Sequence, residues 1–479
     1  MPVRIAVFLL LVVFSSAEAS SFVVSNTADS GTGSLRQAIL DSNSPAGGVH
    51  TMTFSAAYPD NGTVLLSSNL PAILSQSMII MGGSKQPRVD GQSSYSLFAV
   101  GSSNLVLELS DMTLQNALAP EKGACVNSGN SAPSGQLRTE RVSFSNCQAI
   151  GPNLIRGGAI YWNRPNGTLS LIDSRFDGNT ATATASGGEA DGGAIYSVGN
   201  LNALRSRFEG NAVLATNGGG GAGGAIALSG TMGSNTITES TFRFNGASPG
   251  SAILGHGGAI AVGCDNCSTQ VVRSYLRGNS ANYGGSVFAR KSSVGATDVY
   301  ISLANSTIYN GSVVNSGGAV FVGSGASLSA SNNTFYNGDA SDGAHITFAN
   351  TAQVNYFRAN LLAPTYAGTA CSGTPVVTNP GFVGFNLFSD TSCASLEAGA
   401  LPNSPIGTVL VDERPGLIGV LRFSGSAVMD SITNGTICEP RDARFQVRPI
   451  DGDGDGIAYC DVGAYEDPRD VIFIDGFDA

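Results

Sequence analysis

The sequence has little charge of either sign. Only 12% of its 479 residues are Asp, Glu, Lys or Arg, and acidic residues outnumber basic ones to give a net charge of −11. Binding to nucleic acid is disfavoured, because the phosphate backbone selects basic surfaces. The same balance argues against simple electrostatic docking to anionic lipid. The low charge therefore fits an extracellular β protein.

The sequence also lacks any run of about 18 apolar residues, the length that a membrane-spanning helix needs. An N-terminal apolar segment, Ile5 to Phe14, is shorter, with Arg4 before it and Ala17-Glu18-Ala19 after it. This order of charge, apolar core and A-x-A site is typical of a signal peptide. We expect cleavage before Ser20 and a protein that is extracellular or on the bacterial cell surface, with no transmembrane segment.

Eight cysteines fall into four neighbouring pairs, and three of these pairs are separated by 22 residues. In a secreted protein such spacing favours disulfides, although the sequence leaves their connectivity open. Neighbour pairing would join Cys125 to Cys147, Cys264 to Cys267, Cys371 to Cys393, and Cys438 to Cys460. No second CxxC accompanies Cys264 and Cys267, so a disulfide at a hairpin tip is a better interpretation than a zinc site.

Glycine is abundant, with 63 residues, and many of them belong to a repeated pair of motifs. GGAI or a close variant starts at Gly157, Gly192, Gly223, Gly257, Gly284 and Gly317, in steps of 35, 31, 34, 27 and 33 residues. FxxN occurs at Phe176–Asn179, Phe208–Asn211, Phe242–Asn245 and Leu276–Asn279, with looser copies at Ile308–Asn310 and Phe335–Asn337. A period in this range is typical of a stacked array.

The residue types indicate which array this is. Apolar residues alternate before each FxxN motif, as at Leu169 and Leu171, which is the pattern of strands with one buried face. Helical stripes are absent from the repeats, so we predict an all-β fold: one right-handed parallel β-helix (β-solenoid) with one coil per repeat, about 4.8 Å apart. The glycines would turn with positive φ, the Phe would fill the interior, and the Asn would form a ladder along the axis.

The paired GGAI and FxxN repeats, from Gly123 to Asn337, resemble those of the chlamydial polymorphic outer-membrane proteins. That resemblance implies a β-helical surface adhesin. Near the N-terminus, Ser34-Leu35-Arg36-Gln37 reads as a capping box that opens a short helix through Ser42, with Leu35, Ala38 and Ile39 on its apolar face. This helix would cap the solenoid, and its segment is similar to the entry segment of CSLREA-type secreted proteins.

The C-terminal part departs from the period. The segment from Arg448-Pro449 to Gly463-Ala464-Tyr465-Glu466 resembles the choice-of-anchor Q module that follows β-helices in secreted bacterial proteins. We expect residues 1–19 to be a signal peptide, 20–48 an N-terminal cap, 49–339 the repeated β-helix, 340–466 the last coils and end module, and 467–479 a tail.

An acidic motif within this module suggests a calcium site. Asp451, Asp453 and Asp455 alternate in a glycine-rich loop, so their carboxylates can converge on a hard cation. Ile457 could add its carbonyl oxygen, and Asp461 a further carboxylate one residue before the twelfth position of an EF-hand loop. A solvated acidic turn is the alternative, and we expect no other cofactor.

Three insertions fall at the same point of successive repeats: Thr180 to Asp191, Ala212 to Ala222, and Gly246 to His256. In a solenoid such loops lie side by side on one face, which makes that face a candidate binding surface. Passive small-residue loops are the alternative. The leading hypothesis is a monomeric adhesin or glycan-binding protein whose partner is an extracellular glycan or a host or cell-surface ligand. A passive structural surface protein is a further possibility.

An enzyme on the same scaffold, either a polysaccharide lyase or a glycoside hydrolase, is the other alternative. Gly255-His256-Gly257 resembles the GHG motif of polygalacturonases, but that family also uses paired aspartates and this chain has no Asp-Asp dipeptide. Inverting glycosidases need an acid and a base carboxylate across the bond. The histidines His50, His256 and His345 lie far apart in sequence. The sequence therefore identifies no catalytic residue.

Overall fold

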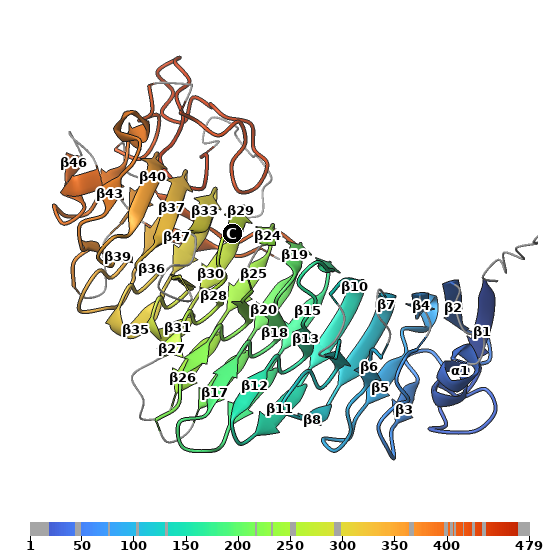
Figure 1. Ribbon diagram of the computed structural model, residues 1–479. Helices are drawn as coiled ribbons and strands as arrows, with labels where there is room; N and C mark the ends of the chain where they lie inside the picture. The colour runs from blue at the N-terminus through green and yellow to red at the C-terminus, as the bar shows by residue number, and fades with distance from the viewer. Residues whose placement is uncertain are drawn as a thin grey trace, which may run out of the picture.

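The structure of the protein is a computed structural model that describes most of the chain after the N-terminus. The described residues are 19–43, 49–74, 77–101, 105–129, 133–215, 218–230, 233–249, 255–291, 298–363, 368–396, 401–402, 406, 409–414, 416–423, 427–433 and 437–467. Within these ranges the chain forms the expected all-β parallel β-helix, which runs from the blue N-terminal end to the orange coils in Figure 1. The predicted signal peptide, except Ala19, and the tail after Asp467 lie outside the described residues.

Three parallel sheets form the walls of the solenoid, and in the described residues they contain 25, 11 and 10 strands. The 10-stranded sheet, here called the GGAI sheet, takes one strand from each coil. In stacking order it contains β6 (Phe98–Ala99), β9 (Val126–Asn127), β13 (Ile160–Trp162), β18 (Ile195–Ser197), β23 (Ile226–Leu228), β28 (Ile260–Val262), β32 (Val287–Ala289), β36 (Val320–Val322), β39 (Ile346–Phe348) and β42 (Cys371–Ser372).

The 11-stranded sheet, here called the loop sheet, carries the insertions. Its first row contains β8 (Leu118–Pro120), β11 (Gln148–Gly151), β16 (Thr180–Ala183), β21 (Ala212–Ala215), β26 (Gly246–Pro249), β31 (Ser280–Tyr283) and β35 (Ser312–Ser316). Its second row contains β12 (Leu154–Arg156), β17 (Glu189–Asp191), β22 (Gly221–Ala222) and β27 (Gly255–His256). The predicted loops are therefore short strands that pair in parallel from coil to coil.

The 25-stranded sheet, here called the large sheet, bends along its length, so most coils contribute two strands. Its first row contains β1 (Ser20–Val24), β2 (Val49–Phe54), β4 (Ser77–Met81), β7 (Val106–Gln115), β10 (Gln136–Ser145), β14 (Thr168–Ile172), β19 (Asn200–Leu204), β24 (Gly233–Thr238), β29 (Cys267–Val272), β33 (Val299–Ala304), β37 (Ala326–Ser331), β40 (Gln353–Arg358), and β43 (Val376–Val377) and β44 (Val383–Gly384), which both pair with β40. Its second row contains β3 (Thr63–Leu65), β5 (Arg88–Asp90), β15 (Arg175–Asp177), β20 (Arg207–Glu209), β25 (Thr241–Arg243), β30 (Tyr275–Arg277), β34 (Thr307–Tyr309), β38 (Thr334–Tyr336), β41 (Leu361–Leu362), β45 (Leu387–Phe388) and β46 (Leu401–Pro402).

The GGAI motif forms the turn between the loop sheet and the GGAI sheet. Its first glycine has positive φ, as at Gly192 with φ +70°, a conformation that L side chains rarely adopt. Its second glycine permits close stacking of coils, because a Cβ at Gly193 would lie 2.1 Å from the carbonyl oxygen of Gly224. The expected role of the glycines is confirmed at these positions.

The FxxN phenylalanines form a stack in the core, as predicted. The motif residues Phe176, Phe208 and Phe242, together with Phe144 of the preceding coil, are fully buried, and successive ring centroids lie 4.6, 4.8 and 4.6 Å apart with the rings nearly parallel. Each such pair contributes about 0.5–1.5 kcal/mol beyond the burial of its area. Leu276 continues the row in the next coil. The stack therefore fixes the register of the central coils.

The FxxN asparagines form the predicted ladder. The side-chain amides of Asn179, Asn211 and Asn245 each donate to the carbonyl oxygen of the next Asn along the axis, at 2.8, 2.9 and 3.0 Å, and end at Asn279. All four side chains are fully buried. The looser copies at Ile308–Asn310 and Phe335–Asn337 do not extend this ladder.

Asn310 and Asn337 instead occupy the turn position that Gly178 holds in an earlier coil, and all three have positive φ. The Asn337 amide donates to Asn310 at 2.6 Å outside the core. These two asparagines therefore form a separate pair at the turn, because the spacing after the apolar residue is one shorter than in FxxN.

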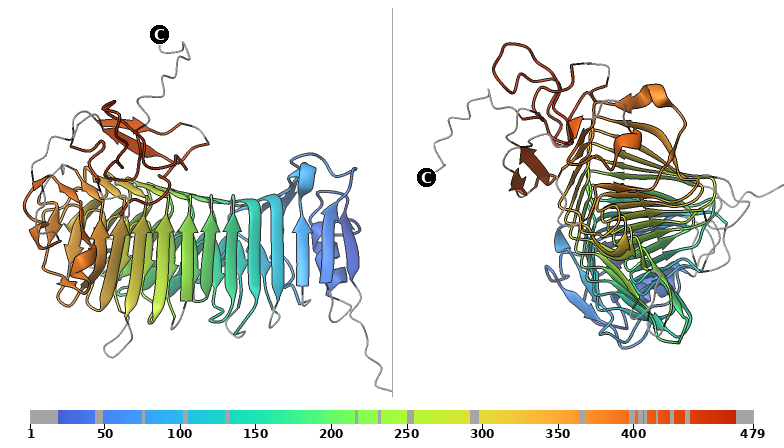
Figure 2. Two further views of the ribbon diagram at one scale, coloured as in Figure 1. Left: turned by 90° about the horizontal axis from the view of Figure 1, so that it is seen from above. Right: turned by 90° about the vertical axis from the view of Figure 1, so that its left-hand side faces the viewer.

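The N-terminal end carries the helix α1 (Leu35–Ser42), which packs on β1. Figure 2 shows it at the blue end of the solenoid. Ser34 caps the helix by accepting from the Gln37 amide at 3.1 Å, and Leu35, Ala38 and Ile39 are buried as expected. The Gln37 side chain donates to Asp41 and does not close the capping box. Because β1 pairs with β2, the large sheet already begins at Ser20.

Within the described residues no helix has the length and hydrophobicity needed to cross a bilayer. After the last coils, the chain forms an antiparallel hairpin of β47 (Val409–Asp412) and β48 (Val420–Phe423) and turns back along the solenoid. Figure 2 shows this C-terminal segment, the described residues from Ile406 to Asp467, against the outer side of the large sheet over the yellow and orange coils.

Polar and apolar contacts hold the C-terminal segment on the sheet. The Glu413 carboxylate accepts from the Tyr275 hydroxyl at 2.6 Å and from the Arg277 guanidinium at 2.7 Å. The Thr334 hydroxyl accepts from the Ala464 amide at 2.9 Å. A second hydrophobic cluster of buried side chains joins the segment to the last coils: Ala359, Leu361, Ala363, Leu387, Ile406, Leu421, Phe423, Val428, Ile432, Cys460 and Val462. The described part of the segment therefore covers the outer face of the large sheet from the coil of β25 to the last coils.

Candidate functional site

A pocket of about 310 Å³ lies where the outer faces of the GGAI sheet and the loop sheet meet. It extends over the four coils of β18, β23, β28 and β32, which is about 14 Å at one strand spacing per coil. Its lining comprises Asp191, Tyr196, Ala222, Ala227, Leu228, Ser229, His256, Ala261, Gly263, Phe288, Arg290 and Lys291. A pocket of this size accommodates a small ligand such as a sugar residue.

The floor and two ends of the pocket come from one row of the GGAI sheet. The residue after each GGAI motif lies in register with its counterparts, in the order Tyr161, Tyr196, Ala227, Ala261, Phe288 and Phe321. The two tyrosines stack with centroids 5.7 Å apart, and the two phenylalanines with centroids 5.3 Å apart. The pocket exists because two alanines interrupt this aromatic row.

A second row, on the loop sheet, forms one wall. Arg156, Asp191, Ala222, His256 and Tyr283 lie in register on successive strands. The His256 ring lies 4.2 Å from the Phe288 ring between centroids. Three of these residues are the last residues of the three predicted loops, so the loops do lie side by side and end at the pocket. Loop residues 216–217 and 250–254 lie outside the described residues.

The carboxylate of Asp191 stands at one end of the pocket. The Arg156 Nε atom lies 3.9 Å from Asp191 Oδ2, and the Arg156 guanidinium lies 4.6 Å from the Tyr196 ring centroid. Burial raises the pKa of Asp191 to about 6, while the Arg156 charge lowers it and the Glu189 charge raises it. Asp191 is therefore ionised at neutral pH and can accept hydrogen bonds from a ligand.

The opposite end of the pocket is cationic. Arg290 is exposed and Lys291 forms an ion pair with Asp298 at 3.1 Å. Burial lowers the pKa of His256 to about 4, and the charge of Arg290 lowers it as well. His256 is therefore neutral at pH 7.

The other two histidines do not join this site. His50 lies in β2 and His345 precedes β39, and both are fully buried. The ring of His345 contacts the carbonyl oxygen of Ala363 at 2.5 Å, and burial lowers the pKa of His345 to about 4. The structure therefore brings no two histidines together among the described residues.

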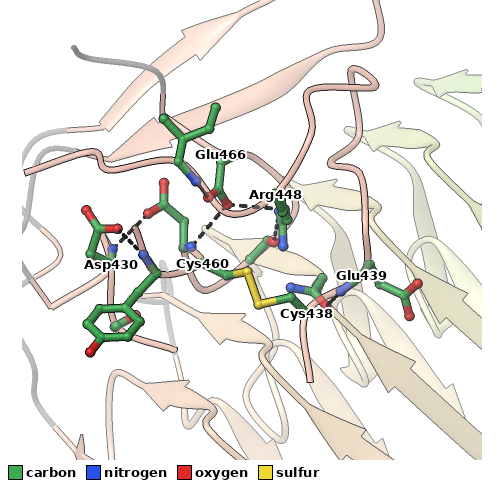
Figure 3. The surroundings of a disulfide bond; sticks show 12 residues. Asp430, Cys438, Glu439, Arg448, Cys460 and Glu466 are labelled. Carbon is green, nitrogen blue, oxygen red and sulfur yellow. Dashed lines mark hydrogen bonds and ion pairs between the residues drawn. A yellow bond between two sulfur atoms is a disulfide. The ribbon is translucent and has the colours of Figure 1, made fainter. Parts of the chain in front are cut away.

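The predicted calcium ligands lie in the C-terminal segment, far from the pocket. Carboxylate oxygens of Asp451 and Asp453 and one of Asp430 lie within 4.8 Å of one another. Figure 3 shows Asp430 beside the Cys438–Cys460 disulfide. Asp430 was not predicted, because no motif connects it to residues that lie more than twenty positions later in the sequence.

The remaining predicted ligands make other contacts. Asp455 accepts from the amide of Ile457 at 2.8 Å, and Asp461 accepts from the amides of Asp430 and Asp467. Asp430 and Asp451 also accept hydrogen bonds from backbone amides. The same hydrogen bonds would be present in an acidic turn that binds no calcium. Calcium binding therefore stays a prediction.

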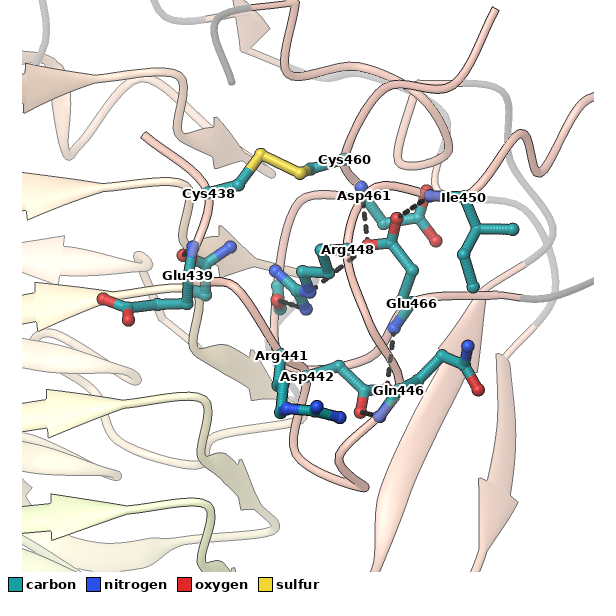
Figure 4. A network of polar contacts seen from close by, with 12 residues as sticks. Cys438, Glu439, Arg441, Asp442, Gln446, Arg448, Ile450, Cys460, Asp461 and Glu466 are labelled. Atoms are coloured by element: carbon teal, nitrogen blue, oxygen red, sulfur yellow. Dashed lines mark hydrogen bonds and ion pairs between the residues drawn. A yellow bond between two sulfur atoms is a disulfide. The ribbon is translucent and has the colours of Figure 1, made fainter. Parts of the chain in front are cut away.

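A buried ionic network holds this acidic turn in place. Arg448 and Glu466 form an ion pair at 3.2 Å, and their side chains are 0% and 1% exposed. Figure 4 shows Glu466 accepting from the amides of Ile450 and Asp461. Burial raises the pKa of Glu466. Removing one partner of such a pair leaves an uncompensated buried charge, so the network has a structural role.

The four disulfides join the neighbouring pairs that the sequence favoured. They link Cys125 to Cys147, Cys264 to Cys267, Cys371 to Cys393, and Cys438 to Cys460. Cys264 and Cys267 are not at a hairpin tip, because their turn connects β28 of the GGAI sheet to β29 of the large sheet. The disulfides indicate an oxidising, extracellular environment.

No protein-family model matches the chain, and no curated protein matches it at a significant level. The fold therefore gives the class, a parallel β-solenoid, and the function has to be argued from the pocket. Sequence reasoning found the loops that flank the pocket but missed its aromatic row. The signal was present in the letter after each GGAI motif, which reads Y, Y, A, A, F, F.

Proposed function

We propose that the protein is a secreted or cell-surface-associated glycan-binding protein that acts as an adhesin through this pocket. The observation that carries the proposal is the aromatic row with a two-alanine gap beside Asp191. Sugar rings present apolar C–H groups to apolar surfaces and hydroxyls to carboxylates, so a pocket with both can recognise a glycan. An ordered pocket on a rigid scaffold also reduces the entropic cost of binding.

An enzyme has less support than a binding protein. A glycoside hydrolase uses two carboxylates across the scissile bond. Among the described residues that line the pocket, Asp191 is the sole carboxylate. Its pKa of about 6 would suit a general acid, but no base stands opposite it in the described lining. A passive structural role does not explain why two alanines interrupt the aromatic row.

The test of the proposed function is a glycan-array screen of the protein after removal of residues 1–19, combined with polysaccharide digestion. Binding of a defined glycan without release of fragments supports the adhesin. Release of reducing-end or unsaturated products that depends on Asp191 would instead identify the protein as a polysaccharide-degrading enzyme. Absence of both from a broad glycan panel would leave the passive surface protein as the better description.

The affinity of the pocket for its glycan is expected to depend on pH through Asp191. Its pKa of about 6 means that the stronger hydrogen-bond acceptor, the carboxylate, forms as the pH rises from 5 to 7. Hydrogen bonds to a charged group contribute about 1.5–3 kcal/mol, so affinity should increase about tenfold over that interval. Titration calorimetry at several pH values checks this.

Asp191→Asn is the matched variant for the pH experiment. It keeps the shape of the side chain and removes the titrating carboxyl, so its affinity should be low and independent of pH. An unchanged pH profile in this variant would contradict the role of Asp191 in binding.

We also propose that the acidic turn binds calcium through Asp430, Asp451 and Asp453. Calcium should then raise the melting temperature, since a ligand at 100 times its dissociation constant stabilises the native state by about 2.7 kcal/mol. Differential scanning fluorimetry with calcium and with a chelator measures the shift. Asp453→Asn should remove it while leaving glycan binding unchanged. Equal melting temperatures with and without calcium would favour the solvated turn.

A further inference from the structure

The pocket has one cationic group whose charge is not balanced within the described structure. We propose that its ligand is a glycan carrying a uronate residue, whose carboxylate binds Arg290, with a neutral sugar beside Asp191. This inference rests on the proposed glycan-binding function and adds the chemical class of the ligand.

Most charged side chains around the pocket have a partner of opposite charge, and Arg290 is the exception among the described residues. Asp191 faces Arg156 at 3.9 Å, and Lys291 pairs with Asp298 at 3.1 Å. Within the described part of the chain, Arg290 forms no ion pair. A guanidinium that lines a pocket and is not paired with a carboxylate of the protein can donate two parallel hydrogen bonds to a carboxylate of the ligand.

The position of Arg290 separates it from the acidic end. Arg290 follows β32, three coils along the axis from Asp191 in β17, which corresponds to about 14 Å. At physiological salt this exceeds the screening length of about 8 Å, so a bound carboxylate would be little repelled by Asp191. The separation allows a neutral sugar at one end and an acidic sugar at the other.

The neighbouring coil limits where the Arg290 side chain can lie. Gly323 leaves room for its aliphatic stem, because a Cβ at Gly323 would lie 2.8 Å from Arg290 Cβ. Next to it, the ring of Phe288 is stacked between the rings of His256 and Phe321 and is buried. A uronate would therefore bind beside these rings, with its carboxylate at Arg290.

The charge of the whole protein restricts the ligand further. The net charge of −11 repels a dense polyanion, so a single guanidinium selects a sparse acidic group. A glycan with isolated uronates meets this condition better than a highly sulfated or phosphorylated polymer.

Titration calorimetry with three disaccharides tests the inference. The probes are glucuronosyl-xylose, its carboxyl-reduced counterpart glucosyl-xylose, and a sulfated glucosyl-xylose. The intact protein should bind the uronate about tenfold more tightly than the neutral disaccharide, the size expected for one charged hydrogen-bonded pair. Arg290→Gln should abolish this preference and leave the affinity for the neutral probe unchanged.

A matched control isolates the role of Arg290. Arg88→Gln removes an exposed cation on β5, away from the pocket. This variant should keep the preference for the uronate. A preference that survives Arg290→Gln overturns the assignment.

The remaining outcomes separate this inference from the proposed function. Equal binding of the acidic and neutral probes, or binding of neutral glycans alone, overturns the uronate and leaves glycan binding intact. Tighter binding of the sulfated probe overturns the carboxylate in favour of a sulfate ester. If neither these probes nor any glycan on the array binds, both proposals fail.

Discussion

Replacing Ala261 by phenylalanine is expected to abolish glycan binding without destabilising the fold. Ala261 lies on the pocket floor and is in register with Phe288. A phenylalanine there would project into the pocket beside the ring of His256, which already stacks on Phe288 with centroids 4.2 Å apart. The added ring would fill the gap in the aromatic row, so affinity should fall at least about 100-fold, a cost near 2.7 kcal/mol.

The same screen that identifies the glycan measures this loss, and thermal unfolding measures the stability of the variant. Thr347→Phe is the control, because Thr347 follows Phe321 in the same row beyond the pocket. It adds the same ring to the same sheet and should leave binding unchanged. A well-folded Ala261→Phe variant that binds like the original protein would exclude the pocket as the binding site.

Replacing Asn211 by leucine is expected to lower the free energy of unfolding more than any other substitution proposed here. The Asn211 amide donates to Phe176 and Asn245, and its carbonyl oxygen accepts from the backbone and side chain of Asn179. Leucine has a similar volume but leaves these four buried groups without that partner. At about 1 kcal/mol for each lost bond, the free energy of unfolding should fall by about 4 kcal/mol.

Urea unfolding followed by circular dichroism measures the effect, and Asn337→Gly is the control, because glycine keeps the positive φ of this position without strain. Asn337 also donates to an asparagine of the adjacent coil, but outside the core, where water can replace the bond. Its loss should cost less than about 1 kcal/mol. Similar losses for the two variants would mean that burial does not determine the strength of these ladders.

The fold could be predicted because each coil repeats the same local solution. Gly192 and Gly193 permit the turn, Phe208 fills the interior and Asn211 bonds to its counterpart, and each of these roles depends on residue type alone. Where a coil departs from the motif, the asparagine takes another position, as at Asn310, which lies at the turn beside the core and pairs with Asn337 there.

The candidate site was predictable only in part. The loops ending at Asp191 and His256 could be placed on one face because their spacing follows the coil. The return of the C-terminal segment could not be predicted, because Glu413 meets Arg277 across 136 positions of sequence without a shared motif. The position of Asp430 in the acidic turn could not be predicted for the same reason, because tertiary contacts and not a local sequence pattern bring it there.

The interrupted aromatic row also has a consequence for how such a protein could diversify. Each coil contributes one residue to the row, and that residue points away from the hydrophobic core. Exchanging alanine for tyrosine or phenylalanine at one coil would move or close the pocket while the glycines, Phe stack and Asn ladder stay the same. Duplicating a coil with alanine at this position would lengthen the pocket by about 4.8 Å. Duplication of the gene segment that encodes one coil could thus allow the protein to bind a longer ligand without any other change in the scaffold.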